Sequence, residues 1–107
     1  MSLSAIVYAV TPAHLLMPSA LAAILRKAPL TPDKVAFTWR AAVGPAVDKA
    51  TTAELRDGVL WVRAKDATWR REVERSSPLI LARLQALLGT DVIRFIDVKE
   101  RDRIRRP

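Results

Sequence analysis

Residues 51–69, TTAELRDGVLWVRAKDATW, decide the fold, because they predict two strands joined by a tight turn and followed by a helix. Asp57-Gly58 favours a two-residue hairpin turn, since both residue types tolerate the positive φ angles that such a turn needs. The two arms of the hairpin are then 51–56 and 59–64. We expect the remaining elements of the chain to pack around this hairpin.

Alternation along the second arm divides its side chains between two faces. Leu60 and Val62 point to one face, which we expect to be the core, so Trp61 must point to the other face with Arg63 and with Arg56 of the first arm. An exposed tryptophan among arginines can stack an unpaired base and neutralise its phosphates, or it can anchor a protein partner. The alternative is that the apolar N-terminal segment or the C-terminal tail covers Trp61.

Helices are predicted on both sides of the hairpin. The first covers about 18–28, and the second covers 31–44 with a possible short extension, its apolar spacing directing Trp39 into the core. After the hairpin, apolar residues keep a helical period over 67–88. This predicts either one helix kinked at Pro78 or two helices in near register.

A third strand is predicted over 91–98, with Ile93 and Phe95 facing the helices and the alternate residues facing away. The element order is therefore α-α-β-β-α-(α)-β. This order indicates an α+β fold, a two-layer sandwich in which helices cover one face of a three-stranded sheet. The opposite face of the sheet is expected to be open and to carry Arg56, Val59, Trp61, Arg63, Arg94 and Ile96.

The chain of 107 residues has the length of one domain. We expect an N-terminal extension over 1–17, a domain over 18–98 and a basic tail over 99–107. The first 25 residues carry no formal charge, but prolines interrupt them and no basic segment precedes them, so neither a membrane span nor a signal peptide is expected.

Charge points to a polyanionic or acidic partner. The net charge is +7, the isoelectric point is about 10.8, and most of the 18 basic residues are arginines. Arginine forks onto phosphate and stacks on bases, so this composition favours nucleic acid or an acidic protein. The absence of cysteine excludes disulfides and thiolate metal sites, and it fits a cytoplasmic protein.

The sequence offers no catalytic, cofactor-binding or metal-binding constellation. His14 is the single histidine and has no potential partners near it in sequence. Neither a Walker A motif nor a dinucleotide-binding glycine motif is present, and the carboxylates are dispersed among basic residues. We therefore expect a protein that is not an enzyme and needs no cofactor.

The candidate binding residues are basic, apart from one tryptophan. An alternative for those on the predicted helix after residue 66 is a solvated surface of paired charges, because Glu72 and Glu74 lie between the arginines. The candidates for binding nucleic acid or a partner are Arg56, Trp61, Arg63, Arg70, Arg71, Arg75, Arg94, Arg101, Arg103, Arg105 and Arg106.

Five short motifs occur in an order that resembles a bacterial protein family. They are W-x-x-x-V-G from Trp39, D-G-x-L-x-V from Asp57, W-x-x-E-V from Trp69, L-x-x-L-Q-x-L-L-G from Leu81 and I-R-F from Ile93. No single motif is specific, but together they resemble the DciA family over residues 18–98.

This resemblance implies a fold like a type II KH domain and a role in DNA replication, in loading the replicative helicase of the DnaB type. It also implies binding to single-stranded or tailed DNA. The chain lacks the GXXG loop with which KH domains clamp nucleotides, so that mode of binding is not expected. Two alternatives remain open: a protein-interaction adaptor with a basic surface and no useful DNA affinity, and an RNA-binding KH-like domain.

Overall fold

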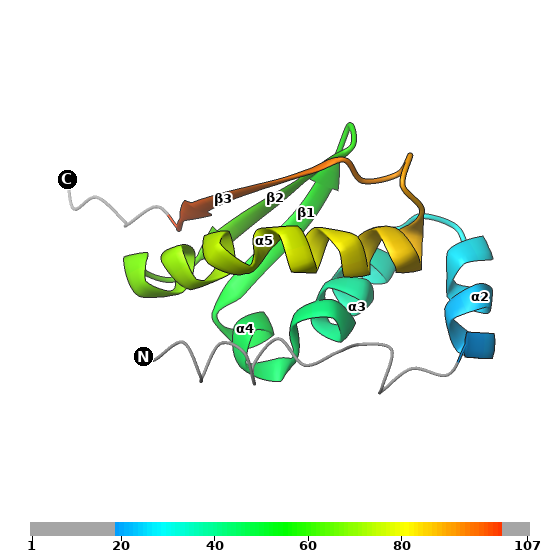
Figure 1. Cartoon of the computed structure of the whole chain (residues 1–107), viewed down its shortest axis with the longest axis horizontal. Helices are drawn as coiled ribbons and strands as arrows, with labels where there is room; N and C mark the ends of the chain where they lie inside the picture. Colours follow the sequence, from blue (N-terminus) through cyan, green and yellow to red (C-terminus); the bar gives the residue numbers. More distant parts are fainter. Residues whose placement is uncertain (1–18, 102–107) are drawn as a thin grey trace.

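The computed structural model describes residues 19–101 and confirms a two-layer α+β sandwich. One sheet has the strand order β1-β2-β3, with β1 antiparallel and β3 parallel to the central β2. Helices α3, α4 and α5 lie on one side of this sheet, and α2 packs at the end of α5 (Figure 1). The elements are α2 (Ser19–Lys27), α3 (Pro32–Val43), α4 (Pro45–Lys49), β1 (Thr51–Arg56), β2 (Val59–Ala64), α5 (Ala67–Leu88) and β3 (Phe95–Glu100).

The hairpin forms as predicted, with both arms at the expected residues. Asp57 and Gly58 adopt φ angles of 52° and 79°, the positive values that a two-residue hairpin turn requires. The turn sets a register that pairs Arg56 with Val59 and continues to Thr51 and Ala64. Leu60 and Val62 are therefore buried on the helix side of β2, as the alternation predicts.

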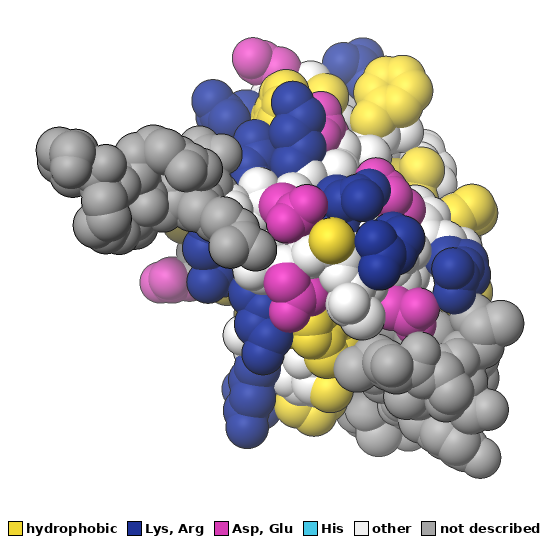
Figure 2. Space-filling view, turned by 90° about the vertical axis from the view of Figure 1, so that its left-hand side faces the viewer, with side chains coloured by type: hydrophobic (Ala, Val, Ile, Leu, Met, Phe, Trp, Pro, Cys, Tyr) yellow, Lys and Arg dark blue, Asp and Glu magenta, His cyan; other side chains and the backbone are white. Residues whose placement is uncertain are grey.

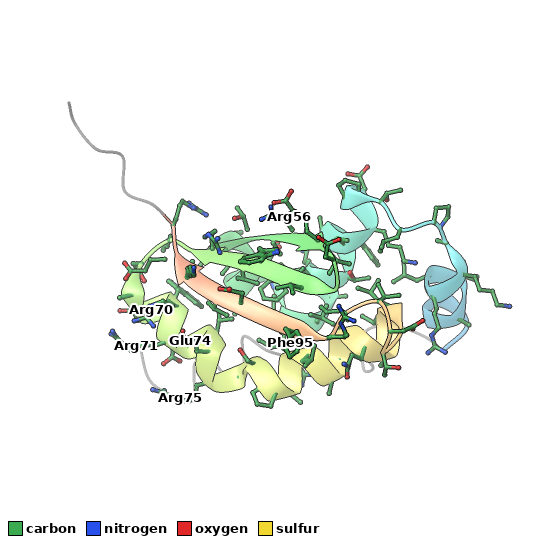
Figure 3. All side chains as sticks on the ribbon, turned by 90° about the horizontal axis from the view of Figure 1, so that it is seen from above. Arg56, Arg70, Arg71, Glu74, Arg75 and Phe95 are labelled. Carbon is green, nitrogen blue, oxygen red and sulfur yellow. The ribbon has the colours of Figure 1, made fainter. Side chains whose placement is uncertain are left out.

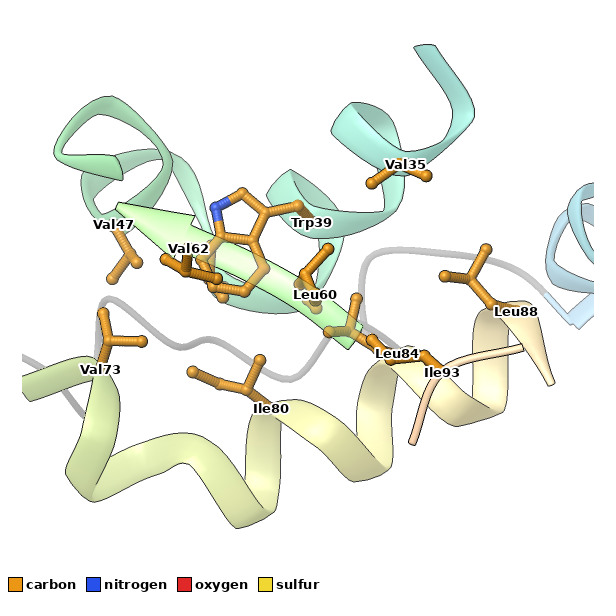
Figure 4. Packing of buried hydrophobic residues seen from close by; sticks show 12 residues of the cluster. Val35, Trp39, Val47, Leu60, Val62, Val73, Ile80, Leu84, Leu88 and Ile93 are labelled. Atoms are coloured by element: carbon orange, nitrogen blue, oxygen red, sulfur yellow. The ribbon is translucent and has the colours of Figure 1, made fainter. Parts of the chain in front are cut away.

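Trp39 lies at the centre of the core with 1% of its surface exposed, which confirms its predicted position. Figure 4 shows its ring against Leu60 and Val62 of β2, and Ile80 of α5 belongs to the same buried cluster. The indole Nε1 donates a hydrogen bond of 2.9 Å to Thr51 Oγ1, so the one polar atom of this buried ring is satisfied.

Helix boundaries follow local capping chemistry. Thr31 Oγ1 accepts a hydrogen bond from the backbone of Lys34, and Asp66 Oδ1 accepts one from the backbone of Trp69. Gly44, at φ 86°, separates α3 from the short α4, so the possible extension of the second helix is a separate helix. Of the two alternatives after the hairpin, the structure has one helix that continues through Pro78.

The third strand differs from the prediction in its bounds and its facing. It covers Phe95–Glu100, and the preceding residues form a loop in which Ile93 is buried. Ile96 pairs with Leu60 and Val98 pairs with Val62, so these two residues face the helices, and Phe95 faces away. The prediction assigned Phe95 and Ile96 to the wrong faces of the sheet. It counted alternation from Ile93, but Ile93 reaches the core from the loop, where strand alternation does not apply.

The described residues form one layer of helices on one sheet, and none of their helices is long and apolar enough to cross a membrane. The whole of the predicted N-terminal extension, residues 1–17, lies outside them. Of the predicted tail, residues 99 and 100 belong to β3, and residues 102–107 lie outside the description.

Candidate nucleic-acid interface

The sheet has one face that no described helix covers, and we call it the open face (Figures 1 and 3). Paired residues of neighbouring strands point to the same side, so the register defines its members. From β1 to β3 the open face carries Thr52, Glu54, Arg56, Val59, Trp61, Arg63, Phe95, Asp97 and Lys99.

Trp61 lies on the open face as predicted, on the central strand, and its side chain is half-buried. The guanidinium carbons of Arg56 and Arg63 lie 5.1 Å and 5.8 Å from the centroid of its ring. These distances are those of cation–π contacts, which contribute roughly 0.5–1 kcal/mol each at exposed sites. No described helix or strand covers the ring.

Arg94 was expected beside Trp61, but it lies in the loop before β3. Its Nη2 donates to the backbone carbonyl of Asp57 at 3.3 Å, and its guanidinium lies against the hairpin turn. A Cβ on Gly58 would come within 2.9 Å of Arg94 Nε and Nη2, so the glycine leaves the space that the guanidinium occupies. The arginines beside Trp61 are Arg56 and Arg63, which were both predicted on this face.

The open face carries both signs of charge. Arg56, Arg63 and Lys99 are basic, while Glu54 and Asp97 are acidic. The Arg56–Glu54 ion pair spans 3.6 Å between largely exposed side chains, and such pairs contribute little to stability. Arg56 can therefore turn to an incoming anion at small cost, whereas Arg63 Nη1 donates to the carbonyl of Val62 at 3.1 Å.

Two of the three predicted arginines at the start of α5 are held in ion pairs. Arg70 Nη1 contacts Glu74 Oε1 at 2.9 Å, and Arg70 Nε lies 3.9 Å from Glu100 of β3. Arg75 contacts the buried Glu72 at 3.1 Å. These contacts agree with the alternative of a helix surface with paired charges.

Arg71 is exposed and joins no ion pair with another described residue. In Figure 3, Arg70, Arg71 and Arg75 lie together at the start of α5, away from Arg56. Figure 2 shows basic and acidic side chains interleaved over the end of the molecule where α5 begins. The charge there is mixed, and the binding role of these arginines stays a prediction.

Three other basic side chains serve the fold by satisfying carbonyls at helix ends. Lys34 Nζ donates to Ala28 O, just after α2, at 2.6 Å, and to Arg26 O, in the last turn of α2, at 3.4 Å. Arg26 donates to the carbonyl of Ala86 in the last turn of α5. Arg83 donates to the carbonyl of Ala42 in the last turn of α3. Partial burial lowers the pKa of the Arg83 guanidinium. Part of the basic composition is therefore structural.

Phe95 was not among the predicted binding residues, because it was expected in the core. The structure places it on the open face with 62% of its surface exposed. A usable signal was present: Ile96 and Val98 are the aliphatic pair of the segment FIDV, and assigning them to the core turns Phe95 outward.

The predicted tail arginines lie at or beyond the end of the described chain. The backbone N–H of Arg101 donates to Ala64 O at 2.6 Å, which extends the β2–β3 ladder by one bond. Its side chain is exposed. Arg103, Arg105 and Arg106 lie outside the described residues.

Comparisons with known proteins agree with the family that the order of the five motifs indicated. The model of a protein family described as "Dna[CI] antecedent, DciA" matches residues 14–98. Over 61 residues the chain is 33% identical to the "UPF0232 protein" of Mycolicibacterium smegmatis (strain ATCC 700084 / mc(2)155), covering 56% of this chain and 31% of that protein. The chain thus spans about a third of that relative's length. No solved structure matches the chain significantly.

Proposed function

The chain belongs to the DciA family, and on this premise we propose that it is a non-enzymatic module that acts in DNA replication. It binds single-stranded or tailed DNA and contacts a replicative helicase of the DnaB type during helicase loading. The observation that carries the DNA-binding part is Trp61 on the open face, with the guanidinium carbons of Arg56 and Arg63 within 5.1 Å and 5.8 Å of its ring centroid.

Trp61 offers an aromatic surface to an unpaired base. Base–aromatic stacking contributes about 1–3 kcal/mol per base and tolerates any sequence, since every base has a π face. Arg56 and Arg63 lie close enough to the ring to contact the phosphates that flank a stacked base. Arginine suits this role, because its planar guanidinium binds phosphate oxygens with two parallel hydrogen bonds.

The lysine and arginine side chains beyond Trp61 extend the same surface. Lys99 lies on the open face next to Arg63 in the register, and Arg101 follows it at the end of β3. Arg71 at the start of α5 is an additional cation with no ion pair among the described residues. We propose that these residues attract the strand electrostatically, while Trp61 holds a base.

Salt dependence of binding to a single-stranded oligonucleotide tests the phosphate contacts. Each contact to a single strand contributes about −0.7 to the slope of log K against log salt concentration, so contacts from Arg56, Arg63 and Lys99 give a slope of about −2. R63A should make this slope shallower by about 0.7. R40A, which removes an equal charge from an exposed position on α3, should leave it unchanged. A flat plot for the wild type refutes the proposal.

A second candidate is an adaptor that binds an acidic protein without useful DNA affinity. The interleaved charges at the start of α5 favour it, because mixed charges complement another protein surface better than a row of phosphates (Figure 2). A pull-down with purified helicase in the absence of DNA separates the two candidates. Competition between RNA and DNA of equal length decides between the two nucleic acids.

A further inference from the structure

Phe95 gives the open face a second aromatic ring on the strand next to Trp61. We propose that Trp61 and Phe95 form a two-base stacking platform that selects an unpaired strand over a duplex. This inference rests on the proposed DNA binding and specifies its ligand. It uses a residue that the electrostatic argument does not involve, so it can be tested separately.

The register fixes the relation between the two rings. Phe95 pairs with Val59 and Asp97 pairs with Trp61, so the aromatic residues are diagonal neighbours on the same face of parallel strands. With a strand separation of about 4.8 Å and a two-residue rise of about 6.6 Å, their Cα atoms are about 8 Å apart. Bases stacked in a duplex lie only about 3.4 Å apart along each strand.

If the rings follow the spacing of their Cα atoms, two successive bases lie on them only after the bases have separated from each other. A paired and stacked duplex cannot do this without local melting, whereas a flexible single strand can splay its bases at small cost. The spacing of Trp61 and Phe95 is thus the physical reason for the selection of an unpaired strand.

The fold does not account for the exposure of Phe95. Its surface is 62% exposed, and the core contribution of β3 comes from Ile96 and Val98 on the opposite side. No hydrogen bond, ion pair or ring contact joins the Phe95 side chain to another described residue. An aromatic side chain that contributes little to the core, next to Val59 and near Trp61, extends an exposed apolar surface suited to a ligand.

The charges around the platform orient the strand. Arg56 and Arg63 lie beside Trp61, and Lys99 lies further along β3. These cations attract phosphates to the edge of the platform that Trp61 and Phe95 form. Asp97 lies on the open face directly across from Trp61, and its negative charge disfavours a phosphate at the middle. Bases therefore face the sheet while the backbone passes along the arginines.

The test compares F95A with L79A for binding to a fluorescent single-stranded oligonucleotide and to a duplex of the same length. Leu79 is an exposed apolar side chain of α5, 49% exposed, so L79A is a matched control for the loss of apolar surface. Since one stacked base is worth about 1–3 kcal/mol, F95A should weaken single-strand binding about 5- to 150-fold. F95W should retain wild-type affinity, and L79A should leave it unchanged.

A second measurement uses an oligonucleotide with abasic sites. Removing bases should weaken binding by the wild type more than binding by F95A, since the variant has already lost one stacking position. If the wild type binds with a steep salt dependence but F95A binds as tightly as the wild type, the platform is refuted and the proposed function stands. If the wild type binds no nucleic acid, the proposed DNA binding and the platform are both refuted.

Discussion

Thr51→Val removes one hydroxyl group from the place where α3, α4 and β1 meet. In the wild type this hydroxyl accepts a hydrogen bond from Trp39 Nε1 at 2.9 Å and donates one to the carbonyl of Val47 at 2.7 Å. Thr51 and Trp39 are both buried, so water cannot replace the lost partner. Valine keeps the shape and strand preference of threonine, and the change therefore isolates the two hydrogen bonds.

The larger loss is at the indole. A buried donor left without a partner costs about 1–3 kcal/mol. The Val47 carbonyl loses less, because it still accepts from the backbone of Ala50 at 3.0 Å. The added methyl group of valine offsets about 0.8 kcal/mol through apolar burial. We expect T51V to lower the free energy of unfolding by about 0.5–2.5 kcal/mol, and Tm by roughly 2–20 °C in a domain of this size.

Urea and thermal unfolding followed by circular dichroism measure this change. The control is T52V, the same substitution one residue later on the exposed open face, which should change stability by less than about 0.5 kcal/mol. In a W39F background the donor is gone, so T51V should cost about 1 kcal/mol less there than in the wild type. If T51V is as stable as T52V, the Trp39–Thr51 hydrogen bond does not stabilise the core and the reasoning is wrong.

Two further substitutions test the hairpin turn and a helix end. G58A places a Cβ 2.9 Å from the Arg94 guanidinium at φ 79°, and it should cost about 1 kcal/mol or more in chemical denaturation. In an R94A background, G58A should cost less stability than in the wild type, because the crowded guanidinium is gone. An equal cost in the two backgrounds would assign the whole loss to the backbone conformation of residue 58. K34M removes the amine that donates to Ala28 O, so α2 should lose protection from hydrogen exchange before the hairpin does; unchanged protection would contradict the capping role.

The features predicted correctly from the sequence depend on residues close together in the chain. A two-residue turn needs only positive φ at Asp57 and Gly58, and it fixes the register of β1 and β2 without reference to the rest of the protein. The core position of Trp39 was predicted from helical periodicity, which is also a pattern over nearby residues.

The third strand was less predictable because its neighbour along the sheet is distant in sequence. The carbonyl of Gly58 accepts from the backbone of Arg94 at 2.8 Å, and the parallel ladder starts at this point. Ile93 reaches the core from the loop, which broke the assumed alternation. A shift of one residue exchanges the two faces of a strand, so Phe95 moved from the expected core to the open face.

The sequence by itself determined the hairpin, the core position of Trp39 and the outward direction of Trp61, since each of these follows from backbone preference or side-chain period over a few residues. Only the tertiary structure decided what surrounds Trp61. It placed Arg94 against the hairpin turn and turned Phe95 onto the open face. Both outcomes depend on the register between β2 and β3, which is set by packing across the whole domain.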